Sequence, residues 1–142
     1  MDEFIATAEL FFGPANSIAG MLVNPSGSNK SITVKALAAA PTQGRVPNVV
    51  LRRLVGATHT PIPDTTPPTA MRVSSLSAAA GAVPTTSGDH TYSGGTVNLE
   101  IALALHTQLG AEIVLDHGEA LAVVMVEDGT GASALFAVRW SE

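Results

Sequence analysis

The stretch that most constrains the fold is residues 115–142, where two strand-like runs flank a short turn. The turn contains an Asp-Gly pair, Asp128-Gly129, which is a strong local signal for a β-hairpin. In the second run the large side chains recur at every second position, as in a strand with one face in a core. These side chains are Phe136, Val138 and Trp140. We therefore predict a C-terminal hairpin that fixes the only Trp of the chain in a sheet.

Residues 96–106 show the same alternation. Leu99, Ile101 and Leu103 are separated by smaller or polar residues. Leu, Ala and Glu are also good helix formers, but a helix would not place all the large aliphatic residues at odd positions. We predict a strand. The candidate core anchors are Leu99, Ile101, Leu103, Phe136, Val138 and Trp140.

The rest of the chain contains short apolar runs separated by residues typical of turns. Residues 18–23 and 31–40 flank a Gly/Ser/Asn loop, which predicts a second hairpin. Residues 60–95 are rich in Pro, Thr, Ser and Gly, and we predict a long, loop-rich insertion there. The sum of roughly eight short strands predicts one all-β domain over residues 1–142, an antiparallel β-sandwich or jelly roll with extended loops.

Composition restricts the possible partners. Apolar residues make up 46% of the chain and charged residues only 13%, with a net charge of −5. Such a low charge suggests that part of the surface is covered by partner proteins. The Lys and Arg residues are scattered, which argues against nucleic-acid binding, and no apolar run is long enough to predict a membrane span. Cys is absent, so neither disulfides nor thiolate metal sites can form.

No motif predicts catalysis. Residues 26–31 end in Lys-Ser, as a phosphate-binding loop does, but Asn24 and Asn29 stand where that motif requires Gly. The four His residues show no metal-binding spacing, and the nucleophile pattern Gly-x-Ser-x-Gly is absent. Asp116 and His117 are better explained as part of a polar turn than as members of a catalytic triad. We predict no catalytic residue, no metal site and no cofactor.

Two segments carry a resemblance to a known group of proteins. Residues 24–30 read Asn-Pro-Ser-Gly-Ser-Asn-Lys before an aliphatic strand, and residues 116–121 read Asp-His-Gly-Glu-Ala-Leu before the closing strands, which end at Arg139-Trp140-Ser141-Glu142. Both resemble features of tailed-bacteriophage virion proteins, in particular the small β-sandwich capsid decoration (cement) proteins. The resemblance implies a protein that is made in the host cytoplasm and binds the major capsid protein lattice on the virion surface, often as a homotrimer.

A decoration role needs residues that contact neighbouring subunits. The first 13 residues are predicted to form either a strand or an N-terminal arm, and three aromatic residues there would suit an arm. The candidate interface residues are Phe4, Phe11, Phe12, Arg52 and Arg53.

Two other functions stay open. The first is a different virion component, such as a tail-tube, connector or fibre-base protein. The second is a carbohydrate-binding module on the same kind of sandwich, for which Tyr92 is the aromatic residue expected in a loop.

Overall fold

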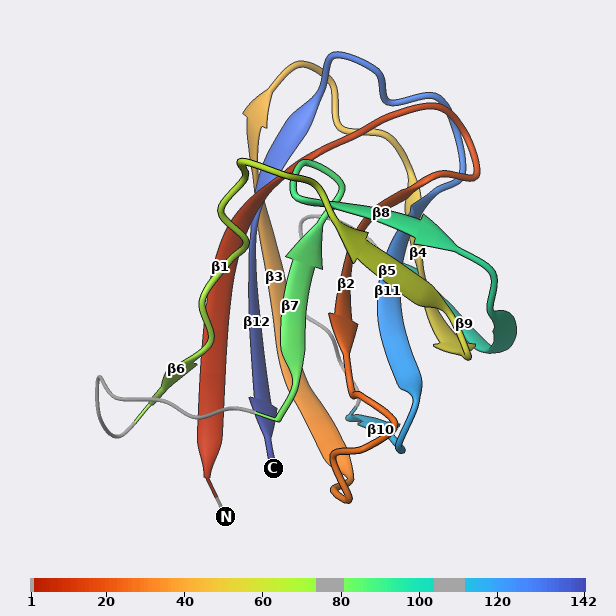
Figure 1. The fold of residues 1–142 in the computed structure, drawn as a ribbon. Coiled ribbons are helices and arrows are strands. Elements are labelled where there is room, and N and C mark those ends of the chain that lie inside the picture. Colours follow the sequence, from red (N-terminus) through yellow and green to blue (C-terminus); the bar gives the residue numbers. More distant parts are fainter. Residues whose placement is uncertain (1, 74–80, 104–111) are drawn as a thin grey trace.

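The structure is a computed structural model that describes residues 2–73, 81–103 and 112–142. Every regular element in these residues is a β-strand, and the strands run antiparallel to their neighbours (Figure 1). The strands are β1 (Glu3–Phe11), β2 (Ile18–Val23), β3 (Ile32–Gln43), β4 (Val49–Val55), β5 (Thr58–Pro61), β6 (Met71–Arg72), β7 (Val83–Thr86), β8 (His90–Ser93), β9 (Thr96–Leu103), β10 (Ile113–Leu115), β11 (Glu119–Met125) and β12 (Ser133–Ser141).

Two five-stranded sheets form the body of the molecule. Sheet A has the order β10-β3-β12-β1-β6, and sheet B has the order β7-β2-β11-β4-β9. Their inner faces enclose the main hydrophobic core, which draws side chains from both sheets. The predicted all-β antiparallel sandwich is therefore confirmed.

The core between the sheets is centred on aromatic side chains of β1 and β12. The rings of Phe4 and Trp140 stack with their centroids 5.9 Å apart, and Phe12 meets Phe136 edge to face at 6.3 Å. Such pairs contribute more than their buried area alone. Trp140 is completely buried, which agrees with a position in the centre of the core.

The other predicted core anchors lie nearer the rim of the core. Leu99, Ile101 and Val138 are partly buried and pack against the main cluster. Leu103 is the last residue of β9, and its side chain is not part of what the structure describes. Because β9 is at the edge of sheet B, its inward side chains have neighbours on one side only.

The two predicted hairpins are wrong. β11 belongs to sheet B and β12 to sheet A, and β2 and β3 are divided between the sheets in the same way. The Asp-Gly turn therefore crosses from one sheet to the other. Asp128 accepts hydrogen bonds from the main chain and hydroxyl of Thr130 at 3.0 and 2.7 Å, so the turn chemistry is local and does not determine which strands pair.

A bulge interrupts the regular alternation of side chains along β3. Trp140 is opposite Val34, whereas Arg139 is opposite Ala36, so one extra residue of β3 is accommodated between them. As a result Ile32, Val34 and Leu37 are buried, and Ala36 lies on the outer face.

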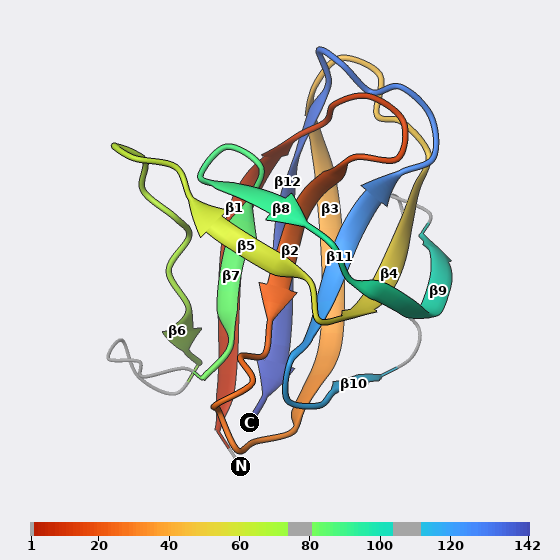
Figure 2. The ribbon, with the colours of Figure 1, turned by 45° about the vertical axis from the view of Figure 1, so that its right-hand side comes forward.

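Residues 60–95 are not a loop-rich insertion throughout. β5 and β8 form a two-stranded ribbon, and β7 extends sheet B. In Figures 1 and 2 the ribbon crosses in front of β2 and β11. A second apolar cluster fills the space beneath it, formed by Met21, Val23, Leu54, Ala120, Ala122 and Val124 with Tyr92 packed against them.

Tyr92 is consequently not an exposed loop residue. Its hydroxyl lies 2.9 Å from that of Thr85, and burial raises its pKa above the ordinary range. This corrects the expectation of a free aromatic ring for stacking on sugars.

Candidate interaction surface

In the part of the chain that is described, the outer face of sheet A carries no further layer of strands. Register places side chains from five strands on this face in cross-strand rows. These outward residues are Val114 of β10, Thr33, Ala36, Ala38 and Ala40 of β3, Leu135, Ala137 and Arg139 of β12, Ile5, Thr7, Glu9 and Phe11 of β1, and Met71 of β6. Sheet B differs because its outer face carries the β5–β8 ribbon.

Large apolar side chains are exposed across this face. Phe11 is 54% exposed, Leu135 43% and Ile5 38%. Between them lies a row of alanines on β3 and β12, so the surface has few projecting side chains. Several large apolar side chains exposed on one sheet face are typical of a surface that contacts another protein.

One end of the face carries a group of paired charges. Arg139 donates a hydrogen bond to the Glu3 carboxylate, and Lys35 Nζ lies 3.7 Å from the same carboxylate. The hydrogen bond from Arg139 is the main reason that the pKa of Glu3 is lowered. Glu9, further along β1, has no ion-pair partner among the described residues. The face therefore combines exposed apolar side chains with a charged group at one end and with Glu9 opposite Leu135.

Of the predicted interface residues in the N-terminal segment, only Phe11 lies on this face. Phe4 and Phe12 are 2% and 5% exposed and belong to the core, so their assignment to an interface is wrong. Residues 3–11 form β1, which pairs along its whole length with β12. Of the two possibilities, a strand is present and an arm is not, because alternate aromatic side chains are needed to close the sandwich.

Arg52 and Arg53 are both engaged within the chain. Arg52 Nε donates to Glu100 Oε1 at 2.6 Å. Arg53 donates to Asn98 Oδ1 at 2.8 Å and to the main-chain carbonyl of Val114 at 3.0 Å. Since Val114 belongs to sheet A, Arg53 links the two sheets rather than presenting an unpaired charge.

The two segments that carry the phage resemblance lie against each other at one end of the sandwich. Asn24 is fully buried, and its side-chain amide donates to the carbonyls of Lys30 and Leu115 at 2.8 and 3.0 Å. The main chain of Asn24 also bonds to Gly118 and Glu119. The Asn side chain therefore holds the loop 24–30 against the turn 116–119, a long-range contact that no local pattern could reveal.

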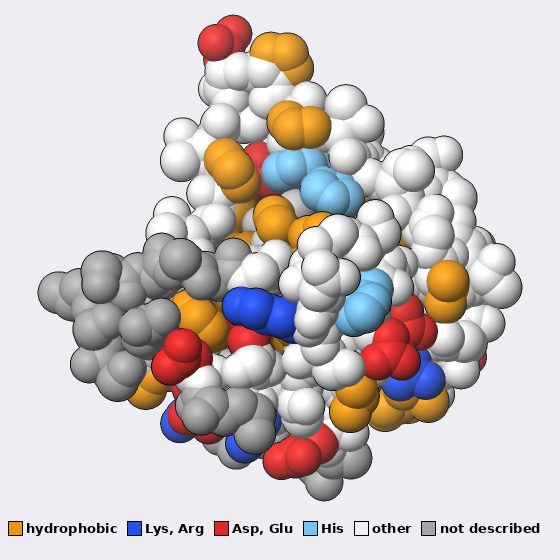
Figure 3. Space-filling model, turned by 60° about the horizontal axis from the view of Figure 1, so that its bottom comes forward, with side chains coloured by type: hydrophobic (Ala, Val, Ile, Leu, Met, Phe, Trp, Pro, Cys, Tyr) orange, Lys and Arg blue, Asp and Glu red, His pale blue; other side chains and the backbone are white. Residues whose placement is uncertain are grey.

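Charges at this end of the molecule are mixed. Figure 3 shows basic and acidic side chains close to each other, and no large basic patch on the face that it presents. Lys30 lies 3.6 Å from Glu142 and Arg53 lies 3.6 Å from Glu119. Such an end offers no single-sign field for binding a polyanion.

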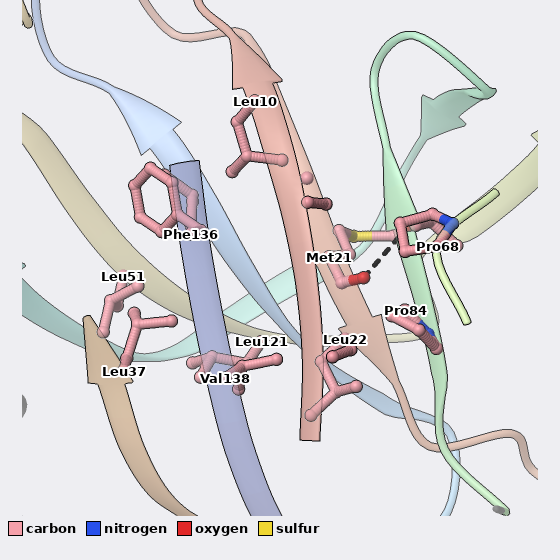
Figure 4. A pocket seen from close by; sticks show the side chains of 15 residues that line it. Leu10, Met21, Leu22, Leu37, Leu51, Pro68, Pro84, Leu121, Phe136 and Val138 are labelled. Carbon is pink, nitrogen blue, oxygen red and sulfur yellow. Dashed lines mark hydrogen bonds between the residues drawn. The ribbon is translucent and has the colours of Figure 1, made fainter. Parts of the chain in front are cut away.

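The interior offers little room for a ligand. An apolar cavity of about 60 Å³ lies between the sheets near β1 and β7, with Leu10, Met21 and Phe136 among the residues that line it (Figure 4). This is far below the several hundred Å³ typical of ligand pockets. Among residues 2–73, 81–103 and 112–142, no group of three or more His, Asp or Glu could hold a metal ion. The same residues contain no helix that is long and apolar enough to cross a membrane.

Sequence reasoning missed most of this surface. Taken singly, the alanines of β3 and β12 did not indicate an exposed sheet face. The available signal was the uninterrupted apolar run of residues 120–126, since a strand that is apolar on both faces needs a layer on each side of its sheet. None of the described strands of sheet A is buried throughout: the burial of β1 and β12 alternates over most of their length.

Comparison of this chain with protein-family models, with curated proteins and with solved structures finds no match.

Proposed function

We propose that this chain is a non-enzymatic structural protein of a tailed-phage virion that decorates the outer head lattice and stabilises it. The observation that carries the proposal is the uncovered apolar face of sheet A, on a molecule whose other sheet is covered by its own ribbon. The resemblance of residues 24–30 and 116–121 to decoration proteins supplies the virion context. In this proposal the partners are the major capsid protein and two further copies of the chain, on the capsid surface.

Physical chemistry supports a binding role for this face. Removing a fully exposed Phe, Leu or Ile side chain from water contributes about 1.5–3 kcal/mol. Phe11, Leu135 and Ile5 are 54%, 43% and 38% exposed, so each can contribute the corresponding fraction. The paired charges Glu3, Lys35 and Arg139 would contribute orientation more than affinity. A lattice of repeated copies adds avidity, so a modest contact per subunit is sufficient.

The experiment uses purified heads of the encoding phage that lack this protein, and measures binding of the full chain by co-sedimentation and electron microscopy. Leu135→Glu, in the centre of the face, should reduce binding at least tenfold. Val97→Glu is the matched control, because Val97 is similarly exposed, at 45%, but lies on β9 of sheet B. Equal binding by both variants and the unaltered chain would exclude this face.

Copy number in whole virions separates decoration from the other virion roles. Gel densitometry against the major capsid protein should give hundreds of copies for a decoration protein. Six or twelve copies, or labelling confined to the tail, would instead assign the chain to a connector, tail-tube or fibre-base role.

A further inference from the structure

We propose that the lateral edge of β1 is a docking site for an extended strand of a partner protein, which would add to sheet A beside Thr7 and Glu9. This site involves main-chain groups at the edge of the sheet and adjoins the outer face, with which it shares the side chains of Thr7, Glu9 and Phe11. The inference does not depend on a virion role.

The first observation concerns the main-chain groups of β1. β12 pairs with β1 at every position, but on the opposite edge β6 pairs only with Phe4 and Ile5. On that edge the Glu3 carbonyl accepts from Val73 N, and the Phe11 carbonyl accepts from the Ser87 hydroxyl. Because main-chain groups alternate in direction along a strand, those of Thr7 and Glu9 point to the same edge. Among the described residues they have no hydrogen-bond partner.

The segment beside this edge covers it without pairing. Residues 62–70 run alongside β1 towards β6 in both ribbon views (Figures 1 and 2). They include Pro63, Pro67 and Pro68, which lack the N–H needed to form a ladder. Main-chain bonds hold the segment at its two ends, from Ile62 N to the Asp89 carbonyl at 2.8 Å and from Val73 N to the Glu3 carbonyl at 2.9 Å. Such a cover prevents uncontrolled edge pairing but can give way to a strand that offers hydrogen bonds.

The second observation is the space on either side of the position that an added strand would occupy. A groove of about 410 Å³ is bordered by Thr7, Glu9 and Phe11 on one side and by Thr65 and Thr66 on the other. The apolar cavity between the sheets begins on the inner side of the same edge. Ala8 and Pro68 line both spaces, and Pro68 is seen at the apolar cavity in Figure 4. Alternate side chains of an added strand would therefore face a polar groove and an apolar cavity.

Charge defines the partner more closely. The Glu9 carboxylate lies on the groove side and has no ion-pair partner in the described part of the chain. The other carboxylate of the groove, Asp89, is engaged by Thr86 at 2.5 Å and by His90 at 2.6 Å. An incoming strand with Lys or Arg opposite Glu9 would form a cross-strand pair of opposite charge. The partner segment is therefore extended, with basic residues alternating with small apolar ones, and it binds by strand addition.

The probe is the synthetic peptide acetyl-Lys-Val-Lys-Val-Lys-Val-amide, titrated into the full ¹⁵N-labelled chain. We expect saturable shifts of the Thr7 and Glu9 amide signals. An analogue methylated on every peptide nitrogen should bind at least tenfold more weakly, because it cannot donate hydrogen bonds. Shifts confined to other strands, equal binding by the methylated analogue, or no binding at millimolar peptide would each overturn the proposal.

Variants of the chain provide a second, independent comparison. Thr7→Pro removes the edge N–H but no bond to β12, because that N–H points away from β12. This variant should lose at least tenfold in affinity, whereas Thr7→Val, which keeps the N–H, should bind as the unaltered chain does. Glu9→Gln should weaken binding several-fold and make it less dependent on salt. If Thr7→Pro fails to fold, the methylated peptide still decides the outcome.

Discussion

Replacing Trp140 with Ala tests whether the core is organised around the contact between β1 and β12. The side chain is fully buried, stacks on Phe4, and donates a hydrogen bond from Nε1 to Glu142 Oε2 at 2.9 Å. Removing a large aromatic side chain from a core costs about 3–5 kcal/mol, since the transfer free energy is lost and a cavity remains. The cavity would lie between the inner faces of both sheets and could close only if they moved together.

The hydrogen bond adds a second, separable contribution. The Glu142 carboxylate also accepts from the main-chain N–H groups of Gly81 and Ala82, at 2.8 and 3.2 Å. Burial raises the pKa of Glu142, but these bonds and that from Trp140 outweigh it, so the pKa is lowered. Because the remaining donors keep the carboxylate satisfied, loss of the indole N–H alone should cost only about 0.5–1.5 kcal/mol. Trp140→Phe removes this hydrogen bond and the smaller ring of the indole but keeps a six-membered ring beside Phe4, so its cost should lie between that of the hydrogen bond alone and that of Trp140→Ala.

The measurement is urea unfolding followed by far-UV circular dichroism, since the variants remove the only Trp and with it the fluorescence signal. Leu135→Ala is the matched control, because Leu135 lies on the same strand with its side chain outward. It should change the unfolding free energy by less than about 0.5 kcal/mol, as expected for a surface position. A loss below 1 kcal/mol for Trp140→Ala, or equal losses for Trp140→Ala and Leu135→Ala, would refute the assignment of Trp140 to the centre of the core.

Three further changes test other parts of the molecule. Burial, and to a smaller extent the nearby His90, lowers the pKa of His59. The unfolded chain therefore binds more protons than the folded chain, and stability should fall as the pH drops below about 6.5. Between pH 7 and 5.5 the melting temperature of His59→Gln should fall less than that of the unaltered chain. Asn24→Ala should cost about 1–3 kcal/mol in urea unfolding, because the Leu115 carbonyl loses the donor of a buried hydrogen bond and the Lys30 carbonyl loses its shorter one; a negligible change would remove Asn24 from its structural role. Gly129→Ala should cost about 1–3 kcal/mol, because the new Cβ would lie 2.5 Å from Pro47 and 2.7 Å from Phe12; Gly27→Ala, with no atom nearby, is its control.

Strands with one buried face were predictable from the sequence, whereas the pairing of strands was not. In β12 and β9 the alternation of large and small side chains reports burial directly, because each inward residue meets the core. β11 is apolar at nearly every position because the β5–β8 ribbon covers its outer face, and such a run carries no period. The turn at Asp128 has the chemistry of a hairpin, but its hydrogen bonds are internal and are compatible with a crossing between sheets.

The amino-acid composition did not predict the two strands of the β5–β8 ribbon. Residues 58–61 and 90–93 lie in Pro-, Thr- and Gly-rich sequence, and their partners are separated by about 30 residues. Pro61 ends β5 and Pro84 lies in β7, an edge strand. These are positions where a missing N–H is tolerated, so Pro content alone indicated a loop where strands exist. The interface prediction was wrong for Phe4 and Phe12 because they are as apolar as Phe11. Only the alternation of side chains along β1 and the residue that follows it distinguishes the three.

β1 combines three separable roles, and its alternation makes each accessible to substitution. Its even-numbered side chains, such as Phe4 and Leu10, pack into the core. Its odd-numbered side chains lie on the outer face of sheet A, and the main-chain groups of the same odd residues point to the open edge. A bulky charge at Thr7, as in Thr7→Lys, should therefore impair contacts of the outer face and leave the edge N–H in place. Thr7→Pro should do the reverse. If both variants lost the same partner equally while retaining the fold, the outer face and the edge would be parts of one interface rather than two.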